Sequence, residues 1–379
     1  MNLTESTIDY EKYNILQYKK YQQGLIKYFF DLTLSYLKTN GFKYDSYEQI
    51  FTHKSMYKDI CYSNLYNLKI MVDGSEYYNL DIPRLTNNFY ILNGAKYIPA
   101  IYVVDYPIIY KKDKKNKKSS ISIYSIFNPI ELLFTTGTAK LFLHIVPINR
   151  LISLYYNDDN FHKELCEKTN LPYKKYDMEE NLKWFKKEYM LSQNDDIFDK
   201  FNKLFLDEFT QNLYYECYGK EVTTVKDVLD ITFDIILNDK KPSFIDLNYK
   251  RLIFIEALLR PVFKATQHYI KLMENKTIIA RSNIKANAIL QWFNTGLERN
   301  FQYLDASPIT AINTLKCSFK SPLSNMTNDK MPSEISSIHP SFYGKICTVS
   351  VSAKNTGVVC HLIPEQTVNL LTGQFIDLS

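Results

Sequence analysis

The stretch HPSFYGKICTVSVSAKNTG, residues 339–357, joins a rigid turn to an alternating strand. The ring of Pro340 fixes its backbone angle, and Gly344 lets the main chain approach its neighbours closely. We expect Tyr343 to pack its ring beneath the turn and Lys345 to present a point charge. The stretch therefore predicts a defined scaffold that carries one charged group.

The alternating pattern continues to residue 363 on both sides of Asn355-Thr356-Gly357 and predicts a β-hairpin. One edge of this hairpin would lack a partner strand within the chain, so it would be available to a second polypeptide. Cys360 and His361 are adjacent in the pattern. Because adjacent residues of a strand point to opposite faces, we do not expect them to act as a nucleophile and its base.

Upstream of this stretch, apolar residues recur with helical spacing in some regions and with strand spacing in others. The pattern predicts helices within 8–39, 155–240, 248–275 and 282–300, and strands within 66–150 with Asn-Gly and Asp-Gly turns. Residues 301–316 indicate a loop that enters a short helix after Pro308. This order predicts a multidomain α+β chain with a mixed sheet and long helices.

The composition is that of a globular protein, with 45% hydrophobic residues among 379. No run approaches the roughly 18 apolar residues of a membrane-spanning helix, and the polar N-terminus lacks the features of a signal peptide. The six cysteines contain no CxxC pair. We therefore expect an intracellular protein with reduced thiols, no membrane contact and no zinc site.

The net charge of +5 is concentrated in one run, KKDKKNKK at residues 111–118, which holds six lysines and one aspartate. The rest of the chain carries equal numbers of basic and acidic side chains. Such a run forms either a solvated loop or an arm that binds phosphate groups. The composition alone leaves both interpretations open.

Arginine is scarce, with six residues against 40 lysines, and four of the six lie between residues 251 and 299. A guanidinium group is a planar fork that grips carboxylate or phosphate through two hydrogen bonds. Arg251 and Arg260 are therefore candidates for nucleic-acid contact, or for salt bridges and subunit contacts on a helix surface. The abundance of Lys, Asn, Tyr and Ile also indicates coding from an A+T-rich genome.

Motifs that carry chemistry are absent from the sequence. Asp227, Asp230 and Asp234 share one helical face, a spacing that can hold a metal, but the opposite face is apolar and predicts a solvated acidic surface instead. No nucleophile elbow, HExxH motif, catalytic carboxylate pair or complete phosphate-binding loop appears. We expect no catalytic residue in this chain.

Several segments resemble the β subunit of multisubunit DNA-directed RNA polymerases. Residues 339–357 resemble the family's HPxxYGRxCPxETPEGxNxG block, and QYLDASPITAINTLK, residues 302–316, is similar to QFMDQNNPLSEITHKRR. LNYKRLIFIEALLRPVFKA, from Leu247, and IKANAILQWFNTGLERN, from Ile284, resemble two successive family helices. FYILNGAKYIPA, residues 89–100, is similar to FIINGTERVIV, and all segments follow the family's order.

The resemblance implies the N-terminal part of a β subunit and is clear over 89–110 and 245–360. It implies a protrusion formed by 1–150 and by return helices in 245–300, a reduced helical lobe in 151–244, and the N-terminal part of the fork in 301–379. In the family the fork lines the RNA–DNA hybrid. The chain would therefore support template-directed RNA synthesis as a non-metal-binding subunit of a nucleotidyltransferase, inactive alone.

By this resemblance one group of residues would contact nucleic acid: Gln302, Lys316, Lys345, Asn355, Arg251 and Arg260. Such contacts reach phosphate or ribose without reading sequence, and Asn355 is equally suited to a turn. A second group would be structural or orienting: Asp305, Pro308, His339, Pro340, Tyr343 and Gly344. Asp305 would order backbone N–H groups, and His339 would bond a backbone carbonyl or, when protonated, nucleic acid.

Two departures from the family pattern have consequences. Both glutamates of PxETPEG are missing from residues 348–354, so other residues would have to supply their contacts. The HKRR run is replaced by Thr314, Leu315, Lys316 and Cys317, which removes the His and Arg that help form the rifamycin pocket. The resemblance thus implies a rifamycin-resistant enzyme.

The family's β subunit continues into a flap and a lysine-bearing segment that have no counterpart in this sequence. A C-terminal β polypeptide would complete the subunit, and β′-like polypeptides would hold Mg²⁺, so this chain binds no cofactor itself. Such split subunits resemble the polymerases of giant bacteriophages. That identity implies a DNA template, an RNA transcript, a promoter-specificity subunit, and a location in the host bacterial cytoplasm or in the virion.

Two other interpretations stay open at this point. One is a non-enzymatic β-like phage protein that binds host polymerase or nucleic acid as a regulator. The other is a structural component of the virion without a role in transcription. Copurification distinguishes these interpretations from the polymerase interpretation, because the polymerase interpretation requires stoichiometric β-completing and β′-like chains.

Overall fold

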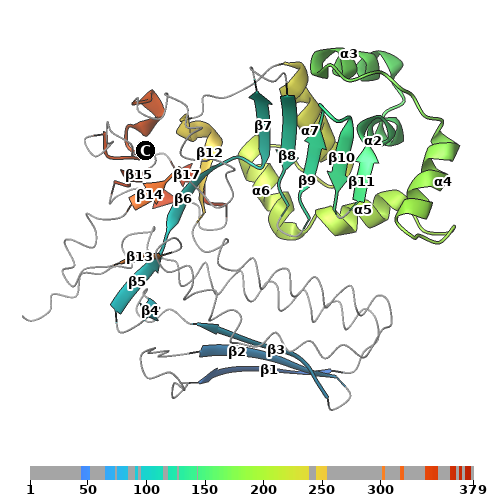
Figure 1. Ribbon diagram of the computed structural model, residues 1–379. Helices are drawn as coiled ribbons and strands as arrows, with labels where there is room; N and C mark the ends of the chain where they lie inside the picture. The colour runs from blue at the N-terminus through green and yellow to red at the C-terminus, as the bar shows by residue number, and fades with distance from the viewer. Residues whose placement is uncertain are drawn as a thin grey trace, which may run out of the picture. The chain divides into compact units, whose positions relative to one another are not determined.

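Two compact units make up the part of the chain that the computed structural model describes. The described residues are 44–51, 65–72, 75–83, 90–92, 95–113, 118–125, 128–142, 144–238, 245–253, 301–303, 316–319, 338–348, 359–363, 367–368 and 372–376. One unit runs from Asp105 to Ser243, and the other draws on residues before and after it. The described residues form a mixed α+β structure, as predicted (Figure 1).

The unit from Asp105 to Ser243 contains a five-stranded antiparallel sheet in the order β11-β10-β9-β8-β7 (Figure 1). Its strands are β7 (Ile108–Asp113), β8 (Lys118–Ile123), β9 (Ile130–Leu133), β10 (Thr138–Leu141) and β11 (His144–Pro147). Each strand pairs with the next along the chain. Alternate residues such as Ile121, Ile123 and Leu132 are completely buried, so one face of the sheet carries the core.

Helices occupy the rest of this unit. They are α2 (Ile148–Tyr155), α3 (Asp159–Thr169), α4 (Met178–Glu188), α5 (Ile197–Phe205), α6 (Glu208–Tyr218) and α7 (Val225–Leu237). From α3 onward each begins with a short polar residue that accepts hydrogen bonds from first-turn N–H groups: Asp158, Asp177, Asp196, Asp207 and Thr224. Among the described residues no helix is long and apolar enough to cross a lipid bilayer.

Aromatic side chains fill the space between this sheet and its helices. Phe185, Phe201 and Phe205 have no exposed surface. The rings of Phe185 and Phe201 meet edge to face with centroids 5.9 Å apart, and Tyr189 lies 4.9 Å from Phe201. Burial of one such side chain stabilises the fold by about 1.5–3 kcal/mol. The helical spacing of these aromatics in the sequence therefore marks the core face of the helices.

The second unit holds three smaller described sheets made by antiparallel pairing. One has the order β1 (Tyr44–Phe51), β2 (Leu65–Val72), β3 (Ser75–Pro83). Another has the order β13 (Phe301–Tyr303), β5 (Ala95–Pro99), β4 (Tyr90–Leu92). The third pairs β16 (Thr367–Val368) with β17 (Phe375–Ile376). The Asp-Gly and Asn-Gly steps that predict turns fall between β2 and β3 and between β4 and β5.

A four-stranded mixed sheet links distant segments in this unit. Its order is β12 (Lys250–Ile253), β6 (Ile101–Asp105), β14 (Lys316–Ser318), β15 (Val359–His361). β14 is parallel to β6 and antiparallel to β15. The side chains of Ile101 and Cys317, which are register partners, are buried. The sheet therefore joins chain segments that are more than 200 residues apart.

Several predictions of secondary structure are confirmed within the described residues. Strands occupy much of 66–150, and helices α3 to α7 occupy 155–240. The run AKLFLHIVPI, which lies within the predicted strand region, holds most of β10, all of β11 and the first residue of α2. The assignment of segments to protrusion, lobe and fork stays a prediction.

The helix predicted from Asn248 is wrong over its first residues. Residues Leu247–Tyr249 form a single 3-10 turn, η3, and Lys250–Ile253 form strand β12 beside β6. Leu252 and Ile253 are adjacent apolar residues, which fit a helical pattern as well as a strand pattern. Pairing with β6 makes this segment a strand. The loop predicted for 301–316 likewise contains strand β13 at its start. The predicted helices within 8–39, 254–300 and after Pro308 lie outside the described residues.

Candidate functional site

A short 3-10 helix, η6 (Pro340–Phe342), forms the turn predicted in the stretch of strongest resemblance. His339 precedes it and caps it, since its Nδ1 accepts a hydrogen bond from the Ser341 N–H at 3.2 Å. Pro340 occupies the first position, where a missing N–H costs nothing. The Ile346 N–H donates to the Phe342 carbonyl at 2.9 Å. The histidine therefore contacts a backbone N–H in place of the expected carbonyl.

The geometry of this turn gives Gly344 a role within the chain and corrects the expectation about Tyr343. Gly344 has φ +73°, in the left-handed region, and an added Cβ would meet nothing within 4 Å. Within the chain the glycine is therefore required for its backbone angle. Tyr343 is 71% exposed and does not pack beneath the turn. Phe342, which is 1% exposed, takes that place and stacks near Phe319 with centroids 6.3 Å apart.

The turn is held against η3, which lies almost one hundred residues earlier in the sequence. The Leu247 N–H donates to Ser341 Oγ at 2.9 Å, and the same hydroxyl lies 2.8 Å from His339 Nδ1. Asp246 caps η3 through the Asn248 N–H at 3.0 Å, and its Oδ1 is 3.9 Å from His339 Nδ1. Each short helix is thus capped by the residue that precedes it, and the Ser341 hydroxyl connects the two helices.

Lys345 is 8% exposed, and its ammonium donates to Asn248 Oδ1 at 3.1 Å. Its Nζ also lies 5.9 Å from the centroid of the Phe375 ring. A buried ammonium is stable only when hydrogen bonds replace the lost water, and Asn248 provides such a bond. This geometry gives Lys345 a partner within the chain and leaves its predicted contact with nucleic acid untested.

Arg251 lies in β12 and is 1% exposed. One terminal nitrogen donates to the Thr372 carbonyl at 3.3 Å, and the next residue, Leu252, donates its N–H to the Gly373 carbonyl at 2.7 Å. Gly373 has φ +78°, and a Cβ there would lie 1.8 Å from the Leu252 carbonyl oxygen. Arg251 therefore fastens the segment 372–374 to the mixed sheet.

The two arms of the predicted terminal hairpin lie beside each other where they are described. Ile346 and Leu362 form an antiparallel bridge, and the Cys347 N–H donates to the His361 carbonyl at 2.8 Å. Lys316 opens β14 in register with His361. Gln302, in β13, is in register with Ile98 of β5. The remaining site candidates, Asn355, Arg260, Asp305 and Pro308, lie outside the described residues.

Described parts of four of the five segments that carry the polymerase resemblance contribute to this one unit. Residues 95–104, 245–253, 301–303, 316–319 and 338–348 belong to it, whereas the described residues of 155–240, for which the resemblance is one of position alone, belong to the other unit. Exposed apolar groups border the turn: Tyr249 is 48%, Ile338 52% and Tyr343 71% exposed. The arrangement is a rigid scaffold with an aromatic surface. The Ser341 hydroxyl beside His339 also accepts the Leu247 N–H, so this pair holds the turn to η3.

The polar partners Asn248, Ser341, Thr372 and Gly373 were missed by sequence reasoning. A local signal existed for one of them, because Asp246 followed two residues later by Asn248 is typical of an N-cap. The others act through contacts between segments that are about a hundred residues or more apart, and no local pattern marks such a contact.

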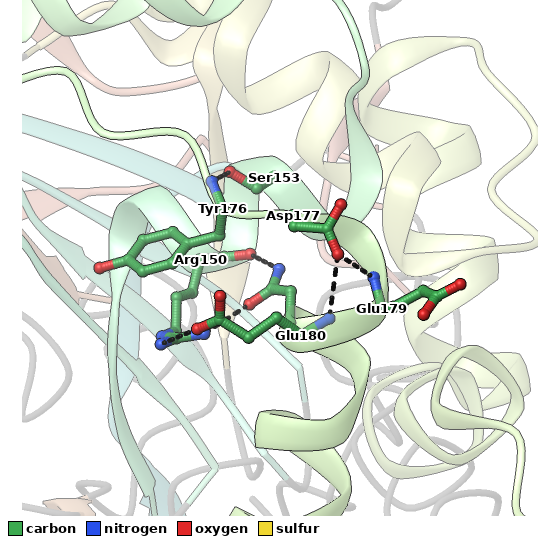
Figure 2. Close-up of polar contacts among 7 residues, drawn as sticks. Arg150, Ser153, Tyr176, Asp177, Glu179 and Glu180 are labelled. Atoms are coloured by element: carbon green, nitrogen blue, oxygen red, sulfur yellow. Dashed lines mark hydrogen bonds and ion pairs between the residues drawn. The ribbon is translucent and has the colours of Figure 1, made fainter.

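A second polar cluster, around Arg150, lies in the other unit (Figure 2). The Arg150 guanidinium lies 4.0 Å from the ring centroid of Tyr176 and 4.7 Å from that of Trp184. It donates to Asn181 Oδ1 at 3.2 Å and lies 3.5 Å from Glu180 Oε1. Asn181, fully buried, donates in return to the Arg150 carbonyl at 2.7 Å. These mutual contacts fasten α2 to α4 and define a structural cluster.

The acidic face of α7 shows each carboxylate with a protein partner. Asp227 accepts from Thr224 in a capping box, Asp230 accepts from the Tyr156 hydroxyl at 2.6 Å, and Asp234 accepts from the Asn238 amide. Within the described ranges no group of three or more His, Cys, Asp or Glu side chains is arranged to hold a metal ion.

A histidine, an asparagine and a cysteine meet inside the helical part of this unit. His162 Nε2 lies 2.9 Å from Asn149 Oδ1, and the Cys166 thiol donates to the same oxygen at 3.5 Å. Burial raises the pKa of Cys166 to about 11, so the thiol is protonated at neutral pH. All three side chains are 9% exposed or less. The trio is therefore a buried packing network and not a nucleophilic site.

Comparison with known proteins adds no relative: no protein-family model and no curated protein sequence matches this chain.

Proposed function

We propose that this chain is the N-terminal part of a split β subunit of a multisubunit DNA-directed RNA polymerase of the giant-bacteriophage type. The ordered series of resembling segments carries the proposal. Its support from the structure is that described parts of these segments, scattered from residue 95 to residue 348, contribute to one compact unit. Segments that must together form one surface in a β subunit are expected to converge in this way.

In this proposal the region from residue 301 onward lines the RNA–DNA hybrid. Gln302 lies within β13, which pairs with β5, and Lys316 begins β14, which pairs with β15. Backbone pairing therefore defines the positions of both residues. The buried side chains of Lys345 and Arg251 would add positive charge beneath this surface. The exposed ring of Tyr343 would contact a partner chain or nucleic acid. Asn355 and Arg260 complete the proposed set of contacts.

The chain's contribution to nucleotidyl transfer is positioning and electrostatic guidance. It would hold the hybrid without reading its sequence, and the orienting residues His339, Pro340 and Gly344 would keep the turn rigid. Mg²⁺ held by a β′-like polypeptide would supply activation of the RNA 3′ hydroxyl and stabilisation of pyrophosphate in the assembled enzyme. The isolated chain is expected to be inactive.

Purification of the native complex through an affinity tag on this chain tests the proposal. The expected complex contains stoichiometric chains that complete β and supply β′, and it synthesises RNA on a DNA template at rifamycin concentrations that inhibit a sensitive polymerase. RNA synthesis by the isolated chain would contradict the proposed division of labour.

The same purification distinguishes the alternatives. Recovery of host polymerase subunits, without chains that complete β, would favour a β-like regulator. Recovery with structural virion proteins alone would favour a virion component.

A further inference from the structure

Exposed apolar side chains flank the junction at which η3 packs against η6. Tyr249 is the last residue of η3, and Ile338 and Tyr343 lie just before and just after η6. All three side chains are about half exposed or more. Pro340, the first residue of η6, is exposed as well. We call Tyr249, Ile338, Pro340 and Tyr343 the junction surface.

The cationic side chains of the same segments are buried. Lys250, Arg251 and Lys345 are each 8% exposed or less. The Lys345 ammonium donates to Asn248 Oδ1 at 3.1 Å, and Arg251 donates to the Thr372 carbonyl at 3.3 Å. The positive charges of this region are therefore bonded within the chain and are not presented to solvent.

The surface that remains exposed here carries no charge. In the described ranges 245–253, 338–348 and 372–376 every exposed residue is uncharged: Asn248, Tyr249, Ile338, Pro340, Tyr343, Gly344 and Ile376. Nucleic acid is held chiefly through exposed Lys and Arg side chains that contact phosphate. The centres of protein interfaces are instead poor in charge and rich in aromatic and aliphatic side chains. The junction surface has the composition of a protein interface.

We propose that the junction surface binds a partner polypeptide and not the RNA–DNA hybrid. The identity of the partner rests on the proposed function: it is the chain that completes β. Because the cations of the junction already have partners within the chain, the fitting counterpart is an apolar surface of that chain and not an acidic segment. Such a counterpart buries the rings of Tyr249 and Tyr343 without leaving a charge unpaired.

The junction is prepared for such a contact before the partner binds. His339 caps η6 and Asp246 caps η3, and the Ser341 hydroxyl connects the two short helices. Gly344 takes the left-handed backbone angle of the turn that follows Tyr343. Side chains carried on a defined backbone lose less conformational entropy on binding than those of a loose loop.

Paired substitutions in the full-length chain test this surface. The variant I338S/Y343S removes one isoleucine and one tyrosine from the junction surface. The control I145S/Y215S removes one of each from the other unit, and all four side chains are more than half exposed. A third variant, I338K/Y343K, adds two positive charges at the junction surface.

Two readouts are compared for the unchanged chain and the three variants. Mass spectrometry of the native complex, purified through a tag on this chain, measures the amount of the β-completing chain. A titration of the purified full-length chain with an RNA–DNA hybrid measures nucleic-acid binding. Circular dichroism verifies that each variant is folded.

Both junction variants are expected to lower recovery of the β-completing chain at least about tenfold, which corresponds to about 1.4 kcal/mol, because an interface loses its apolar anchors. The control should keep this recovery, and I338S/Y343S should bind the hybrid as the unchanged chain does. Equal recovery with I338S/Y343S and with I145S/Y215S would overturn the proposal. Hybrid binding that I338S/Y343S loses and I338K/Y343K restores would also overturn it, since it would identify a nucleic-acid surface.

The composition of the complex separates failure of the surface from failure of the proposed function. A complex that contains β-completing and β′-like chains, makes RNA and is unaffected by I338S/Y343S would contradict the junction surface alone. An unchanged chain recovered without any β-completing chain would contradict the proposed function, and with it the identity of this partner.

Discussion

The ammonium of Lys345 lies 3.1 Å from the side-chain oxygen of Asn248, although 97 residues separate the two in sequence. The contact joins η3 to the turn that follows η6. It also places a lysine of the strongest sequence motif inside the fold, where its first role is to hold two segments together.

Removal of Asn248 should weaken this junction. N248A is expected to lower the free energy of unfolding by about 1–3 kcal/mol, because a buried ammonium loses a charge-assisted hydrogen bond. The variants K345M and N248A/K345M complete a double-mutant cycle, measured by urea unfolding and circular dichroism. A coupling energy of about 0.5–1.5 kcal/mol is expected. Strictly additive effects would show that the contact does not stabilise the fold.

The two left-handed glycines should differ in their tolerance of alanine. G344A is expected to cost about 1–2 kcal/mol, which is the backbone penalty alone, because open space surrounds the added methyl group. G373A is expected to cost about 3 kcal/mol or more, because its Cβ would overlap the Leu252 carbonyl oxygen and displace the strand. Thermal unfolding of the two variants gives the comparison. Equal costs would contradict the close approach at Gly373.

Substitution of the exposed Tyr343 and of the buried Phe342 should distinguish an effect on assembly from an effect on the stability of the fold. F342A is expected to lower the free energy of unfolding by about 3–5 kcal/mol because it opens a cavity. Y343A should change it by less than about 0.5 kcal/mol. If the proposed function is correct, Y343A should instead reduce recovery of partner chains or binding of an RNA–DNA hybrid. A strongly destabilised Y343A would show that the ring packs within the chain.

Local patterns account for much of the fold and for little of the candidate site. Asp-Gly and Asn-Gly steps mark two hairpins, and helical spacing marks the core helices. Strand β1, whose polar residues interrupt any apolar pattern, was not predicted. The junction of Lys345 with Asn248 depends on a pairing across 97 residues, which local periodicity does not encode. Likewise, the exposure of Tyr343 follows from the direction of a turn, while its neighbour Phe342 fills the core.

Acid should destabilise the helical unit through His162. Burial lowers the pKa of His162 below its ordinary value of 6.5; the Asp159 carboxylate opposes this shift and the Lys175 ammonium adds to it. The unfolded chain therefore binds a proton more readily than the folded chain. Stability is complete above pH 6.5 and is lost as the pH falls toward the lowered pKa.

The variant H162Q removes this titration. The free energy of unfolding is measured between about pH 7 and pH 5 for the chain and for the variant, since a buried neutral histidine must charge in that range. The difference between the two should shrink as the pH falls. A difference that stays constant over this range would show that His162 titrates normally.

We propose that this chain is one part of a divided polymerase β subunit. Mass spectrometry of the native complex, purified through this chain, tests it most directly. We expect equimolar amounts of this chain, of a chain that completes β and of β′-like chains, in a complex that makes RNA. A chain recovered alone, or only with intact host polymerase, would contradict the claim.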